Sequence, residues 1–150
     1  MSDRRQTLLV AAREFCDAFA DKKPPSELFA YFSSSDDVMA YEHGLPQLAP
    51  FLGRQFTGQK GLREYFDLLS SALSYENMAF SHLFVDPEVS KVSVRGRATF
   101  TWTSTGQSWD EVFTYVLEFD DDVKVKTYEI WADSGAAYLA SRGELTGDAG

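Results

Sequence analysis

Apolar residues recur at helical spacing through the first half of the chain. An amphipathic helix of about four turns is expected near the N-terminus, because its apolar stripe repeats every three to four positions. The stripe consists of Leu8, Ala12, Phe15 and Phe19. Pro24 and Pro25 end this helix and open a shorter one over residues 26–32. A third helix is expected over residues 59–73, where the apolar positions again follow the helical period.

The period of the pattern changes to two in the second half of the chain. Strands are expected over residues 79–85, 92–103, 109–119 and 123–131, with turns rich in Asp and Gly between them. A short strand is expected earlier, over residues 38–42, and a last helix over residues 135–142. We expect the ordered core to span about residues 6–142 and the tail, 146–150, to be frayed.

This order of elements predicts a single α+β domain over residues 1–150. The predicted fold is a cone-shaped, strongly bent antiparallel sheet, with three N-terminal helices packed on its concave face. Gly96 lies in the middle of a strand, where glycine often marks a bulge or a bend. An aromatic share of 15% suits a sheet that curls around a small ligand, and equally suits a well-filled core.

The net charge of −9 and the pI of about 4.6 narrow the possible partners. An acidic surface repels phosphate backbones and anionic membranes, so neither nucleic acid nor a membrane is expected as a partner. The segment Met1 to Gln6 lacks the apolar core of a signal peptide. We therefore expect a cytoplasmic protein.

Metal and nucleotide motifs are missing from the sequence. One Cys and two His are too few ligands for a typical zinc site, and neither a Walker loop nor a GxGxxG motif occurs. Cys16 falls on the apolar stripe of the first helix and is interpreted as a small buried hydrophobe. No cofactor and no metal are expected.

The last predicted hairpin provides the main argument for a catalytic residue. A turn at residues 120–122 would pair Phe113 with Glu129 on the apolar face of the sheet, with Tyr115 diagonally opposite. A carboxyl group among apolar neighbours has a raised pKa, as a general acid or base near neutrality requires. Alternatively, Glu129 forms an ion pair with Arg95 or Arg97, or lies at an exposed strand end.

Other residues on the same predicted face are candidates for the site. Glu111 would lie near the rim of the cone, whereas Asp133 is better explained as the cap of the last helix. The predicted walls of a substrate pocket are Phe100, Trp102, Phe113 and Trp131. His82 is a further catalytic candidate, against an ordinary strand histidine, because the direction in which its strand faces is ambiguous.

Two segments give the chain a resemblance to a known superfamily. Residues 56–66, FTGQKGLREYF, open a helix after a glycine, and a long meander ends in residues 128–133, YEIWAD. Together with the order of elements, they resemble the nuclear transport factor 2-like superfamily, most closely its SnoaL-like polyketide cyclase branch. The resemblance covers about residues 6 to 140 and implies a cone-shaped sheet, a pocket and frequent dimers.

More distant resemblances point to individual residues. The strand around His82 is similar to one that carries a catalytic histidine in scytalone dehydratase, although residues 109–111 replace the second histidine of that enzyme. Tyr41, Glu42 and His43 lie where ketosteroid isomerase carries its base, and the spacing leaves open which of them faces the pocket. Phe15 stands where that enzyme has the tyrosine of its oxyanion hole, so a ketosteroid isomerase proper is not expected.

Three functions follow from these observations. The first is a cofactor-independent enzyme that cyclises, isomerises or rearranges a small, largely apolar metabolite, with Glu129, Tyr115 and His82 in proton transfer and Tyr41 among the substrate contacts. The second is a non-catalytic binding module with the same pocket, and the third is an interaction domain that uses the sheet. A homodimer through the outer face of the sheet is expected, because Val112, Val116, Tyr128 and Ile130 are predicted to project there.

Overall fold

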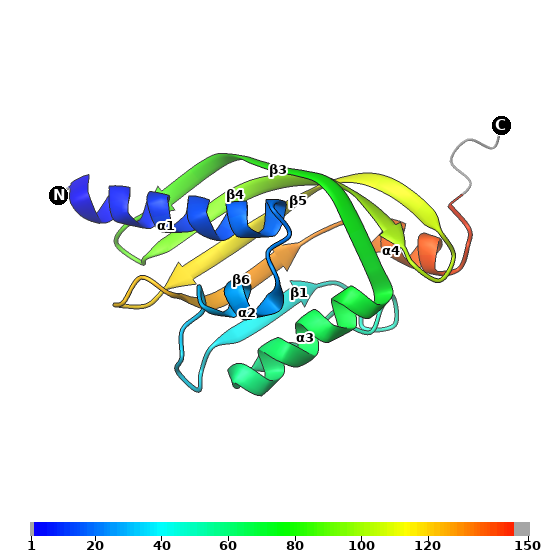
Figure 1. The fold of residues 1–150 in the computed structure, drawn as a ribbon, viewed down its shortest axis with the longest axis horizontal. Helices are drawn as coiled ribbons and strands as arrows, with labels where there is room; N and C mark the ends of the chain where they lie inside the picture. Colours follow the sequence, from blue (N-terminus) through cyan, green and yellow to red (C-terminus); the bar gives the residue numbers. More distant parts are fainter. Residues whose placement is uncertain (1, 146–150) are drawn as a thin grey trace.

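A computed structural model describes residues 2–145 as four helices and six strands (Figure 1). The helices are α1 (Ser2–Ala20), α2 (Pro25–Phe29), α3 (Gly58–Ala72) and α4 (Ser134–Ser141). The strands are β1 (Met39–His43), β2 (Gln55–Thr57), β3 (Leu73–Asp86), β4 (Lys91–Trp102), β5 (Gln107–Phe119) and β6 (Val125–Trp131). The predicted α+β fold is confirmed, and the tail over 146–150 lies outside the described residues.

All six strands form one sheet in the order β2-β1-β6-β5-β4-β3. The sheet is mixed, because β1 runs parallel to β6 while every other neighbouring pair is antiparallel. The prediction of a purely antiparallel sheet is therefore wrong at β1. This strand comes from the helical half of the chain and reaches β6 without a hairpin, so its direction is free to differ. Figure 1 shows α1, α2 and α3 on one side of the sheet.

The apolar stripe of α1 packs against the sheet as its spacing predicted. Leu8, Ala12, Phe15 and Phe19 are between 0% and 6% exposed. Phe15 meets Phe32 and Tyr128 edge to face, with ring centroids 5.3 and 5.5 Å apart. Cys16 is buried in the same contact zone, and burial raises the pKa of its thiol to about 12.

The sheet bends at β3 rather than at Gly96. The pairing of β3 with β4 shifts twice, between Glu76 and Ala79 and between Ser81 and Phe84. Such bulges increase the local twist and bend a strand. Gly96 pairs regularly with Phe113, and a Cβ atom at Gly96 would lie 2.2 Å from the Phe113 ring. The glycine is needed for this close approach, not for a bulge.

The register of the last hairpin differs from the prediction. Glu129 pairs with Val116 rather than with Phe113, a displacement of three residues. The turn is longer than expected, because Val123 takes a φ of 60° inside it, and a further irregularity follows at Phe119. An odd displacement moves every side chain of β6 to the opposite face. Glu129 and Trp131 consequently lie on the outer face, and Tyr128 and Ile130, predicted outside, are buried inside.

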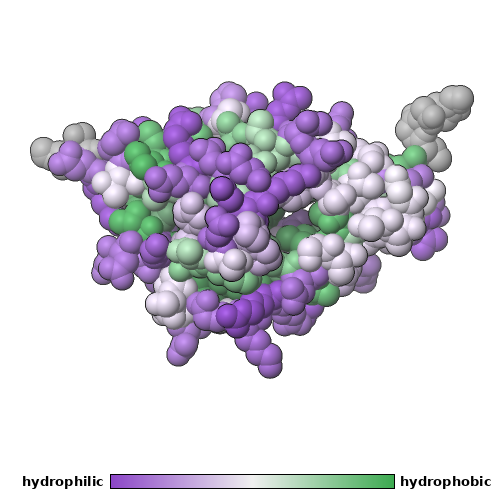
Figure 2. All heavy atoms as spheres, viewed as in Figure 1, coloured by the Kyte–Doolittle hydropathy of each residue, from purple (hydrophilic) through white to green (hydrophobic). Residues whose placement is uncertain are grey.

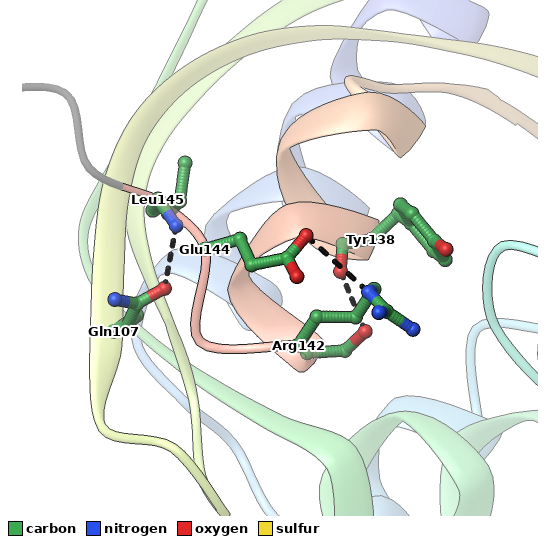
Figure 3. A network of polar contacts seen from close by, with 6 residues as sticks. Gln107, Tyr138, Arg142, Glu144 and Leu145 are labelled. Atoms are coloured by element: carbon green, nitrogen blue, oxygen red, sulfur yellow. Dashed lines mark hydrogen bonds and ion pairs between the residues drawn. The ribbon is translucent and has the colours of Figure 1, made fainter.

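The last helix closes one end of the sheet. Asp133 caps α4 by accepting a hydrogen bond of 3.0 Å from the backbone nitrogen of Ala136, as predicted. Beyond the helix, the backbone nitrogen of Leu145 donates to the side chain of Gln107 on β5 over 2.8 Å (Figure 3). This contact ties the end of the described chain to the sheet. Among residues 2–145, no helix is long and apolar enough to span a membrane.

Candidate functional site

A cavity of about 440 Å³ lies between the helices and the inner face of the sheet. Most of its wall is apolar, and the aromatic members are Phe19, Phe29, Phe51, Tyr65, Phe66, Tyr75, Phe100, Trp109, Phe113, Tyr115 and Tyr128. Figure 2 shows this face of the molecule hollowed, with hydrophobic atoms inside the hollow and hydrophilic atoms around it. The volume falls in the range of pockets that hold small organic ligands.

Glu42 is one of two buried carboxylates in the wall of this cavity. It lies on β1 and is 8% exposed, and its Oε1 accepts a hydrogen bond of 2.7 Å from the hydroxyl of Tyr65 on α3. Burial raises the pKa of Glu42 from 4.5 to about 7; the Tyr65 hydrogen bond lowers it and the charge of Glu111 raises it. Glu42 can therefore both accept and release a proton near neutrality.

The alternation of β1 explains which of its three polar residues faces inward. Ala40 and Glu42 are buried, whereas Tyr41 and His43 alternate to the outer face. The choice that the sequence left open is thus resolved in favour of Glu42. Tyr41, predicted as a substrate contact, is not among the cavity-lining residues.

Glu111 is a second carboxylate in the cavity wall, on the inner face of β5 as predicted. Its Oε1 accepts a hydrogen bond of 2.7 Å from the indole nitrogen of Trp109, and the backbone of Asp133 also hydrogen bonds to it. Burial raises the pKa of Glu111, and these hydrogen bonds partly oppose that effect. Two carboxyl groups with donors already in place therefore lie on one cavity.

The tyrosines of the cavity are neutral hydrogen-bonding groups. Tyr115 and Tyr128 are buried side by side, with ring centroids 4.9 Å apart, and burial raises the pKa of both phenols far above neutrality. Tyr115 was predicted on this face, and the structure places it in the wall of the cavity. Such phenols donate hydrogen bonds but do not act as bases at neutral pH.

The predicted catalytic pair of Glu129 and Tyr115 is not brought together. Glu129 lies on the outer face, where its Oε2 is 2.9 Å from Nε2 of His43. The sequence had suggested Arg95 or Arg97 as the partner of Glu129, and the structure shows His43 instead. Trp131, predicted as a pocket wall, is 42% exposed on the same outer face and stacks on His43 with ring centroids 4.2 Å apart. Both errors come from the three-residue change of register.

Two further predictions of position differ from the structure. His82 sits at the second irregularity of β3, with a φ of 56°, and its exposed side chain contacts Ser81 rather than the cavity. Trp102 is buried beside Phe51 but is not among the cavity-lining residues. Phe100 and Phe113 line the cavity as predicted.

Several cavity residues were not identified from the sequence. Tyr65 lies three positions after Leu62, so the helical period of α3 could have placed it on the buried face. Trp109 lies two positions before Glu111 on β5 and shares its face. Within residues 2–145, no group of three or more His, Cys, Asp or Glu side chains is placed to hold a metal ion.

Searches with the sequence found no matching family model and no match among curated proteins. Solved structures do match the fold. An NTF2-like protein of unknown function from Burkholderia pseudomallei has a TM-score of 0.74 at 16% identity, covering 89% of this chain and 96% of its own. A candidate SnoaL-like polyketide cyclase from Jannaschia sp. CCS1 has a TM-score of 0.75 at 13% identity, covering 93% of this chain and 94% of its own.

A candidate isomerase from Bacillus subtilis is similar to the same extent. Its TM-score is 0.75 at 11% identity, and the match covers 93% of this chain and 96% of that protein. Identities this low carry information about the fold and not about the reaction. The helices over a bent sheet, the cavity between them and these matches together show that this chain has the NTF2-like fold seen in SnoaL-like cyclases.

Proposed function

We propose that this protein is an acid/base enzyme that isomerises, cyclises or rearranges a small, largely apolar metabolite, with Glu42 as the proton-transfer residue. The observation that carries the proposal is a buried carboxyl group with a pKa of about 7 in the wall of a 440 Å³ cavity. Perturbed carboxyl groups in clefts are typical of general acids and bases. The cyclase and isomerase names of the structural neighbours support the same class.

The chemistry follows from the groups around the cavity. The carboxylate of Glu42 takes a proton from a carbon next to a carbonyl group, the electron pair of the C–H bond forms a C=C bond, and the C=O π pair moves onto the oxygen to give an enolate. Tyr115 and Tyr128 are neutral donors on the cavity and would hydrogen bond to that oxygen. Glu42 then returns its proton to another carbon. Alternatively, the enolate carbon attacks a second carbonyl carbon and closes a ring, the C=O π pair moves onto that oxygen, and the resulting alkoxide takes the proton from Glu42.

Each buried carboxylate has a distinct environment in this proposal. Among residues 2–145, the Tyr65 hydroxyl is the one side-chain donor to Glu42, so its charge is poorly compensated and its proton is mobile near neutrality. Glu111 accepts from Trp109 and from the backbone of Asp133, which favours its charged form. We assign proton transfer to Glu42 and a charge-stabilising or second acid/base role to Glu111.

Proton transfer can be tested before the natural substrate is identified. The protein would be incubated in heavy water with a panel of small aromatic ketones, and deuterium uptake next to the carbonyl would be followed by mass spectrometry. Glu42→Gln keeps the shape of the side chain and should slow the exchange about 100-fold or more. Glu129→Gln is the matched control on the outer face and should exchange at the wild-type rate.

Exchange that persists at full rate in Glu42→Gln would contradict the assignment. Ketones that bind but undergo no exchange in the wild-type protein would favour the alternative function, a binding module with the same cavity. Mass spectrometry of a small molecule that co-purifies with the protein would then identify the natural ligand.

A further inference from the structure

The positively and the negatively charged side chains of the cavity lie mainly at different places, the cations at its opening and the buried carboxylates at its floor. Its exposed lining includes three cations, Lys22, Lys23 and Arg63, whereas Glu42 and Glu111 are each 8% exposed. The cations come from the connection between α1 and α2 and from the outer side of α3. The mouth between these elements therefore carries three cations against one exposed carboxylate, Asp67, and the floor is acidic.

Two of these cations lie over aromatic rings of the cavity wall. Nζ of Lys22 lies 5.4 Å from the ring centroid of Tyr75, and the guanidinium carbon of Arg63 lies 5.9 Å from that of Phe29. Both rings line the cavity. Cation–π contacts of this kind hold the charged groups close to the opening instead of leaving them extended into solvent.

The three cations lack carboxylate partners among the described residues. The ion pairs of residues 2–145 that involve Lys or Arg are Arg54 with Glu64 and Arg142 with Glu144. Asp67 lies one helical turn after Arg63 on α3 and also lines the cavity, but within residues 2–145 it forms no ion pair with Arg63. The chain has a net charge of −9, so a cluster of three cations without carboxylate partners at one opening stands out from the rest of the charge distribution.

We propose that the cavity takes an amphipathic anion, a flat apolar ring system that carries a carboxylate or a similar acid group. The ring system lies between the aromatic walls, and the acid group remains at the mouth with Lys22, Lys23 and Arg63. The acidic floor repels an anion, so the charges at the two ends select one direction of binding. This proposal depends on the proposed function in one respect, namely that the uncharged end of the ligand contacts Glu42.

Asp133 is compatible with this direction of binding. It is an exposed residue that lines the cavity next to Glu111, on the side of α4, and it adds negative charge at that end. Its carboxylate is engaged in capping the helix. An acid group on the ligand would therefore find opposite charge only at the mouth between α1 and α3.

Two matched probes test the proposal, 2-naphthoate and its uncharged analogue 2-naphthamide. Binding would be measured by calorimetry at neutral pH and at low ionic strength, where exposed charges are least screened. The wild-type protein should bind the carboxylate about tenfold more tightly than the amide, as three partly exposed cations allow. The preference should shrink as salt is added.

Three variants make the result specific. A triple variant, K22Q/K23Q/R63Q, should bind both probes equally, with the affinity for the amide unchanged. A control triple variant, K60Q/R95Q/R97Q, changes the net charge by the same amount at exposed positions outside the cavity lining and should keep the preference. Glu42→Gln should also keep it, because the acid group does not contact the floor.

Equal affinity for the two probes in the wild-type protein would overturn the proposal, as would a preference that survives in K22Q/K23Q/R63Q or no binding of either probe. These outcomes are distinct from failure of the proposed function. If proton exchange fails but the preference for the carboxylate probe is kept, the role of Glu42 is wrong and the role of the mouth stands. If the preference is absent but exchange occurs, the role of the mouth is wrong and the role of Glu42 stands.

Discussion

The hydroxyl of Tyr65 lies 2.7 Å from Oε1 of Glu42, and this hydrogen bond joins α3 to β1 inside the fold. Tyr65 is 1% exposed and Glu42 is 8% exposed, so neither group exchanges freely with bulk water. The phenol is the neutral partner, because burial raises the pKa of Tyr65 well above 10. The pair therefore contains one mobile proton near pH 7, on the carboxyl group.

Removing the Tyr65 hydroxyl should raise the pKa of Glu42 above its value of about 7, because this hydrogen bond stabilises the carboxylate. In Tyr65→Phe, proton exchange should therefore reach its maximum at a higher pH, and stability should fall by roughly 1–3 kcal/mol. Tyr75→Phe is a control that loses a hydroxyl bonded to the carbonyl of Phe19. An unchanged pH profile in Tyr65→Phe would argue against the role of this hydrogen bond.

Glu42 should make the protein less stable as the pH rises. Its pKa is about 7 in the folded protein and 4.5 without burial, so between these values only the folded state holds the proton. The stabilisation is complete below pH 4.5 and is lost as the pH passes 7, a change on the order of 3 kcal/mol.

Urea unfolding at a series of pH values measures this contribution. Glu42→Gln should remove most of the decline in stability, leaving the smaller contribution of Glu111, whose pKa is also raised. Glu129→Gln should decline as the wild-type protein does. A Glu42→Gln variant with the full wild-type slope would show that the carboxyl group is not protonated in the fold.

The packing of Gly96 against Phe113 predicts a large effect of one methyl group. In Gly96→Ala the new Cβ would lie 2.2 Å from the Phe113 ring, so the ring or the strand must move. We expect a loss of about 1–3 kcal/mol in thermal or urea unfolding. Gly135→Ala is the control, since its Cβ would meet nothing closer than 3.5 Å. Equal stability of the two variants would contradict the close approach.

We propose a dimer through the outer face of the sheet; of the four residues expected there, Tyr128 and Ile130 instead face the core. Val112 and Trp131 are 63% and 42% exposed there. Trp131→Asp should convert a dimer into a monomer in light scattering at micromolar concentration, whereas Leu45→Asp, at a loop position that is 61% exposed, should not. A wild-type protein that is monomeric over this range would contradict the proposal.

The fold was predictable because its elements have strong periodic patterns. The helical stripe of α1 and the alternation of β4 both specify which side chains are buried, and the structure follows them. The pairing of β5 with β6 was not predictable to the residue. It depends on the turn before Val125, where Val123 adopts a positive φ that its β-branched side chain disfavours.

The correct placement of the site residues depended on strand alternation and on the length of the turn before β6. Tyr115, Phe113 and Glu111 were placed correctly, because their face follows from the alternation of one strand. Glu129 was misplaced, because its face depended on the length of a turn. Glu42 was ambiguous, because alternation places it opposite Tyr41 and His43 but does not say which of the two faces is inside. The burial of Ala40 and Glu42 and the contact of Glu42 with Tyr65 show that its face is the inner one.

Titration of the glutamate side chains tests the central claim most directly. Carbon NMR of protein labelled at the glutamate carboxyl groups would follow each signal from pH 3 to pH 9, in the wild-type protein and in Glu42→Gln. We predict one carboxyl signal with a midpoint near pH 7 that is missing from the variant. Glutamate signals that all titrate below about pH 5, the ordinary range of the residue, or a midpoint near 7 that persists in Glu42→Gln, would contradict the assignment of Glu42 as the proton-transfer residue.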